Sequence, residues 1–96
     1  MSTDPREFEL DKPWQLDEQV AVRPEPFGAL LYHYGTRRLS FLKNPTVLTV
    51  VRTLADHRSA RSACESAGVP ARAMPAYERA LATLARSAMI RERDDQ

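Results

Sequence analysis

The sequence is poor in cysteine, glycine and histidine, which limits the chemistry it can carry out. Its 96 residues include one cysteine, three glycines and two histidines. A single cysteine excludes an intramolecular disulfide, and three widely separated glycines do not form a phosphate-binding loop. His33, His57 and Cys64 are not spaced as metal ligands, and the alanine-rich stretch around Cys64 favours a buried residue over a reactive thiol. We therefore predict no catalytic residues, no metal and no cofactor, and a protein that is not an enzyme.

Long apolar segments and a strong excess of charge are absent as well. No apolar run approaches the roughly 18 residues of a membrane helix, and the first residues lack the apolar core of a signal peptide. The formal net charge is +1, which gives no overall attraction to nucleic acids or acidic membranes. We therefore expect a cytoplasmic protein that contacts neither. With 43% hydrophobic and 28% charged residues, the composition is typical of one soluble globular domain.

The chain divides into an arm, a domain and a tail. Residues 1–18 are polar and show neither helical nor strand periodicity, so we expect an irregular N-terminal arm. Trp14 is the exception, and we favour a tryptophan that folds back on an apolar patch over one that contacts a partner. Residues 19–90 carry the periodic patterns of a recognition domain, and residues 91–96 form a polar tail that we expect to fray.

Three strands are expected near residues 19–23, 28–34 and 37–42, connected as a meander. Pro24 and Pro26 cannot donate to a ladder and are assigned to the first connection, while Gly35 and Thr36 lie in the second turn. The middle strand has apolar residues on both faces and is expected to be central. In the third strand, Leu39 and Phe41 alternate with polar residues, which predicts that they form its buried face.

Three helices follow the strands. Asn44 and Pro45 are start signals for the first helix, Ser59 can cap a second that Gly68 ends, and Pro75 opens the third. The predicted fold is therefore α+β, with a three-stranded antiparallel sheet followed by three helices in a winged helix-turn-helix-like arrangement.

The third strand presents an edge with little protection. Edge strands usually carry proline, lysine or a bulge, whereas "RRLSFL" has no proline and contains apolar residues. Such an edge can accept an extended peptide as an added strand. The third helix offers a facing surface, because beside its core stripe run small residues and then arginines. The predicted peptide-binding residues are Arg38, Leu39, Ser40, Phe41, Leu42, Ala76, Arg79, Ala80 and Thr83. Arg37, Arg38 and the arginines of the helix would favour an acidic peptide.

Several of these segments together resemble a known family. "RPEPFGALLYHYGTRRLSFLKNP", followed by "VVRTLADH", "AGV" and "PAYERALATLARSAMI", closely resembles the peptide chaperones of mycofactocin biosynthesis, the MftB family. The resemblance covers residues 23–90, and its first block is the specific one. The sequence departs from the family at Ser87-Ala88-Met89, where a glycine is usual before the apolar end of such a helix, so the exact end of the third helix is left open.

The resemblance implies a fold, a site and two partners. The family belongs to the precursor-recognition modules typified by the pyrroloquinoline quinone peptide chaperone, in which a leader peptide adds beside the third strand and against the third helix. It implies a short ribosomal precursor peptide with an acidic leader as the ligand. It also implies a radical S-adenosylmethionine maturase with iron–sulfur clusters, which decarboxylates and cross-links the precursor, whereas the chaperone does no chemistry.

Two alternatives remain open at this stage. A winged helix-turn-helix DNA-binding regulator would use the stripe of Arg72, Arg79 and Arg86, but the low net charge and few base-reading side chains argue against it. A homodimer through the third strand would instead pair the open edge with its own copy.

Overall fold

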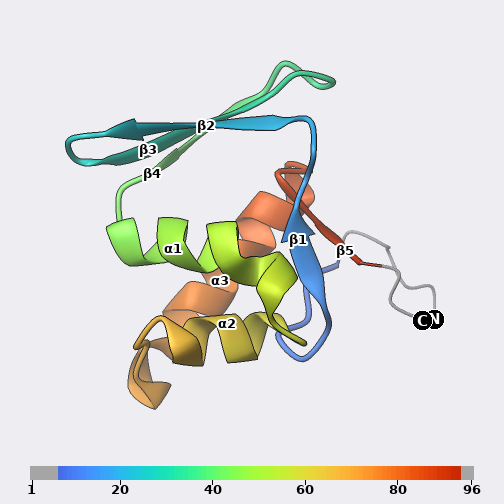
Figure 1. Ribbon diagram of the computed structural model, residues 1–96. Coiled ribbons are helices and arrows are strands. Elements are labelled where there is room, and N and C mark those ends of the chain that lie inside the picture. Colours follow the sequence, from blue (N-terminus) through green and yellow to red (C-terminus); the bar gives the residue numbers. More distant parts are fainter. Residues whose placement is uncertain (1–6, 94–96) are drawn as a thin grey trace.

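The computed structural model describes residues 7–93 and consists of a sheet above three helices (Figure 1). The antiparallel sheet contains β2 (Val20–Glu25), β3 (Gly28–His33) and β4 (Leu39–Leu42), in the order β2-β3-β4. The α+β class and the central position of β3 are therefore confirmed. The likeness to a winged helix-turn-helix stays a prediction.

Two of the three helices begin where the sequence predicts, and the third begins one residue before the predicted Pro75. They are α1 (Pro45–Thr53), continued by the 3₁₀ turn η1 (Leu54–Asp56), α2 (Ala60–Ser66), and α3 (Met74–Arg86), which follows the 3₁₀ turn η2 (Ala71–Ala73). The Asn44 side chain caps α1 by accepting from the Thr46 amide, and Ser59 caps α2 by accepting from the Ser62 amide. Gly68 follows α2 with φ +89°, the left-handed conformation that favours glycine.

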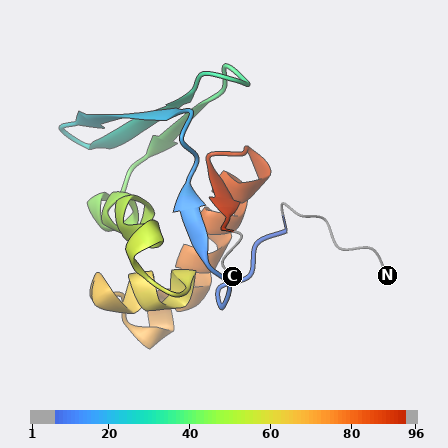
Figure 2. The same cartoon turned by 45° about the vertical axis from the view of Figure 1, so that its right-hand side comes forward.

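Two short strands correct the prediction of an irregular arm and a frayed tail. β1 (Trp14–Leu16) pairs antiparallel with β5 (Ile90–Glu92), forming a second, two-stranded sheet beside the helices (Figure 2). Trp14 is completely buried, as the folding-back interpretation requires, and its indole nitrogen donates to the Glu9 carbonyl at 2.8 Å. Residues 1–6 and 94–96 of the predicted arm and tail lie outside the described residues.

Pro24 corrects the predicted first connection, because it lies within β2 and pairs with Ala29. The Tyr34 amide donates to the Gln19 carbonyl, and antiparallel residues alternate between bonded and non-bonded pairs. In this register Pro24 falls in a non-bonded pair, so its nitrogen faces away from β3. An edge strand tolerates proline in that position.

The faces of β4 are the reverse of those that the sequence predicts. Leu39 is 61% exposed and Phe41 48% exposed, while Leu42 is buried. Paired residues in a sheet share a face, and the buried Ala29 and Leu31 of β3 pair with Leu42 and Ser40. Leu42 and Ser40 therefore face the helices, and Leu39 and Phe41 point away from them.

At the end of α3, an alanine occupies the position where the family usually has a glycine. The Ala88 amide donates to the Ala85 carbonyl and the Met89 amide to the Leu84 carbonyl, the two bonds of a Schellman motif. Ala88 therefore takes φ +63°. An alanine in this left-handed conformation costs about 1–2 kcal/mol in steric energy. The helix ends where a glycine would end it, at a position that glycine would occupy without that cost.

Replacing Ala88→Gly should raise the free energy of unfolding by about 0.5–1 kcal/mol, because the steric cost exceeds the entropic cost of glycine. Urea denaturation followed by circular dichroism measures this change. Ala82→Gly, within α3, is the matched control and should lower stability by up to about 1 kcal/mol. A loss of stability in both variants would contradict the inferred cost at Ala88.

Candidate functional site

A groove with a volume of about 300 Å³ lies between the end of β4 and α3. β4 contributes Phe41 and Leu42, and α3 contributes Ala76 and Ala80. The remaining lining residues come from the connection between β4 and α1, from α1 and from α3: Lys43, Asn44, Val47 and Tyr77. Small alanine side chains on one wall leave room for an apolar group between the strand and the helix.

The structure brings four of the nine predicted site residues together in this groove, namely Phe41, Leu42, Ala76 and Ala80. The other five do not line it. Arg38, Leu39 and Arg79 are exposed, Ser40 is half-buried, and the Thr83 hydroxyl donates to the Arg79 carbonyl on its own helix. Binding by any of the nine stays a prediction.

Asn44 and Tyr77 are groove residues that sequence reasoning assigned only to a cap and to the core. Asn44 Nδ2 donates to the Tyr77 hydroxyl at 3.1 Å, while Asn44 Oδ1 accepts from the Thr46 amide at 2.8 Å. One side chain therefore caps α1 and joins it to α3. The position of Asn44, two residues after β4, is the one sequence signal that could have placed it at the end of the groove.

The outer edge of β4 has unpaired main-chain groups within residues 7–93, since β4 pairs there only with β3. The His33 amide donates to the Arg38 carbonyl, which sets the alternation along β4. Ser40 and Leu42 therefore bond to β3. The N–H and C=O groups of Leu39 and Phe41 point outward, beside the groove.

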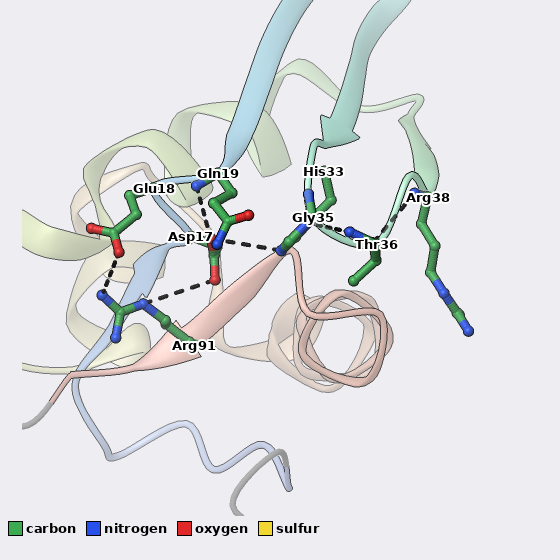
Figure 3. A network of polar contacts seen from close by, with 8 residues as sticks. All are labelled: Asp17, Glu18, Gln19, His33, Gly35, Thr36, Arg38 and Arg91. Carbon is green, nitrogen blue, oxygen red and sulfur yellow. Dashed lines mark hydrogen bonds and ion pairs between the residues drawn. The ribbon is translucent and has the colours of Figure 1, made fainter.

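A polar network holds the turn that leads into β4 (Figure 3). His33 Nδ1 accepts from the Gly35 amide at 3.0 Å and from the Thr36 amide at 3.1 Å. Because Nδ1 accepts two bonds, we assign the ring proton to Nε2, which lies 3.7 Å from Asp17 Oδ1. The turn before β4 is thereby tied to the segment between β1 and β2.

Asp17 continues this network toward the second sheet. Its Oδ1 accepts from the Gln19 amide at 2.8 Å, and its Oδ2 lies 3.9 Å from Arg91 Nε (Figure 3). Arg91 belongs to β5 and also approaches the Glu18 carboxylate at 3.7 Å. The network therefore connects β5 with the sheet that carries the open edge.

His33 is buried, with 5% of its surface exposed. Both of its ring nitrogens have partners within the fold, as the network requires.

Burial raises the pKa of the Cys64 thiol, so little thiolate forms near neutral pH. In residues 7–93, no group of three His, Cys, Asp or Glu side chains could hold a metal ion. No helix in that range is long and apolar enough to span a membrane.

Comparisons with known proteins identify relatives over most of the chain. The model of the "Peptide chaperone MftB family" matches residues 13–91. "Peptide chaperone MftB" of Mycobacterium ulcerans is 61% identical over 83 residues, covering 86% of this chain and 76% of the relative. The protein of the same name from Mycobacterium tuberculosis is 60% identical over 87 residues, covering 91% and 80%. No solved structure matches this chain.

Replacing His33→Phe should lower the free energy of unfolding by about 2 kcal/mol, because the Gly35 and Thr36 amides lose their shared acceptor. Urea denaturation measures the change. Asp17→Asn keeps an acceptor for the Gln19 amide and removes the negative charge beside His33 and Arg91, so it should cost less. An Asp17→Asn variant at least as unstable as His33→Phe would show that the Asp17 charge, and not the turn, is the main contribution.

Proposed function

Because this chain belongs to the peptide chaperone MftB family, we propose that it binds an acidic ribosomal precursor peptide and presents it to a radical S-adenosylmethionine enzyme. The peptide binds as an extended strand along β4. Alternate side chains of the peptide then enter the groove against α3. The enzyme carries out the chemistry, and the chaperone holds the peptide.

The observation that carries this proposal is the position of the groove directly beside the unpaired edge of β4. Main-chain groups of Leu39 and Phe41 are available to a partner strand, and Ala76 and Ala80 leave room for its side chains. Strand addition combines these two features, with main-chain bonds for affinity and pockets for specificity. Burying two apolar side chains of the peptide contributes about 3–6 kcal/mol before the cost of ordering it.

The charges near the groove support an acidic peptide. Lys43 lines the groove. Arg37 and Arg38 precede β4, Arg79 lies on α3, and all three are exposed. A cationic border attracts an acidic peptide and accelerates its association at low salt. Trp14 is buried in the core and does not line the groove, so it does not compete with a peptide there.

The main-chain part of the proposal is tested by Leu39→Pro with Leu39→Ala as its matched control. Both variants lose the leucine side chain, but only proline removes the outward amide, which makes no bond to β3. Leu39→Pro should bind the precursor peptide about tenfold more weakly than Leu39→Ala, as expected for one lost hydrogen bond and a disturbed edge. Isothermal titration calorimetry measures both affinities. Equal affinities would exclude strand addition at β4.

The groove is tested by filling it. Ala76 is exposed and lines the groove, so Ala76→Trp should leave the fold intact and block the space. We expect peptide affinity to fall by about tenfold or more through steric exclusion. Ala71→Trp, an exposed position in η2 outside the groove, is the control and should bind normally. Unchanged binding by Ala76→Trp would place the peptide elsewhere.

A further inference from the structure

The outer face of the β2-β3-β4 sheet lies opposite the helices, and no other element of residues 7–93 covers it (Figure 1). This face carries a group of large apolar side chains. Leu39 and Phe41 of β4 pair with Tyr32 and Leu30 of β3, so these four residues share this face. Tyr34 continues the row, and its ring packs edge-on against Tyr32 at 5.4 Å. We call this group the outer apolar face.

The exposed apolar residues are concentrated at this sheet. Among residues 7–93, the large hydrophobic side chains with high exposure are Phe27 at 81%, Tyr34 at 62%, Leu39 at 61% and Phe41 at 48%. Phe27 lies in the turn between β2 and β3, and Tyr34 begins the turn at the other end of β3. Contiguous apolar patches on a globular domain often mark interaction surfaces, whereas single exposed apolar residues are common and need no such explanation.

Two arginines, Arg23 and Arg37, border the outer apolar face. Arg23 pairs with Leu30 across the strands, and its side chain is 77% exposed. Glu25 is its neighbour at 3.5 Å and offsets part of that charge. Arg37 is exposed between β3 and β4, whereas Arg38 pairs with the buried His33 and lies on the helix side of the sheet. The surface therefore fits a partner with an apolar centre and an acidic border.

The groove opens on the helix side of β4, whereas the outer apolar face lies mainly on the other side of the same strand, and Phe41 belongs to both. A peptide bound along β4 would extend the sheet and leave the outer apolar face open. Its alternate side chains would also point outward, next to Leu39 and Phe41. A protein that binds this face thus contacts the chaperone and the bound peptide together.

We propose that the outer apolar face is the surface on which the chaperone binds the enzyme that modifies its peptide, an inference that rests on the proposed function. The enzyme presents an apolar patch with acidic residues at its border. Because the bound peptide enlarges this face, the enzyme binds the loaded chaperone more tightly than the free chaperone. A second copy of this chain fits the face less well, since its arginines would approach those of the first.

The experiment uses Tyr34→Ser, a position of the outer apolar face outside the groove and its main-chain edge, both alone and as a double variant with Phe27→Ser in the adjoining β2–β3 turn. Calorimetry with the precursor peptide should give an affinity within about twofold of the unaltered protein, as expected for exposed positions. Binding of the peptide-loaded variant to the radical S-adenosylmethionine enzyme should weaken by about tenfold or more, as expected when aromatic residues are removed from an interface. Arg23→Glu should weaken the same step.

Arg58→Glu is the matched control for the charge change, because Arg58 is exposed in the loop between η1 and α2. It should bind the enzyme normally. Normal enzyme binding by the double variant overturns the proposal. If that variant also changes from a dimer to a monomer, the face is instead an interface between two copies of this chain. If the unaltered protein binds the enzyme but not the peptide, the proposed function fails. Enzyme binding by the same variants then still tests whether the outer apolar face is the binding surface.

Discussion

The two hydrogen bonds of Asn44 hold the groove in shape. The residue stands where the chain leaves the sheet and enters α1, and its side chain bonds both to the first turn of α1 and to Tyr77 of α3. A capping side chain alone contributes about 1 kcal/mol to a helix. Here it also links the segment that follows β4 to α3, and Tyr77 and Asn44 both line the groove between the strand and the helix. The other end of β4 depends on the His33 turn, so both ends of the short strand are held by side-chain hydrogen bonds.

A second constraint on the end of β4 is the close approach of the β2–β3 turn to its backbone. Gly28 begins β3 with φ +150°, and a Cβ there would overlap the Leu42 carbonyl. Only glycine therefore lets the β2–β3 turn lie against the end of β4. This contact, Asn44 and the His33 turn together fix β4 as a strand with one bonded edge and one open edge.

Much of this fold follows from local signals in the sequence. Asn44-Pro45, Ser59 and Gly68 mark helix ends because capping chemistry is local, and the meander follows from alternation and turn residues. The β1–β5 pair could not be predicted, because each strand has three residues and pairing across most of the chain leaves no periodic signal. The faces of β4 could not be assigned either, because alternation separates two faces without saying which one the helices cover. The small residues of the groove, Ala76 and Ala80, could be predicted from the sequence. The Asn44–Tyr77 contact could not, because it depends on how two helices pack.

The shortness of β4 limits how long a stretch of ligand it can read. With four residues in the strand, only Leu39 and Phe41 offer outward amides and carbonyls, so strand pairing accounts for a span of about four or five ligand residues. The remainder of any longer peptide receives no main-chain support from this sheet. Under the proposed strand addition, recognition would rest on one compact motif of the peptide, and the sequence on either side of that motif would be free to vary in length and composition.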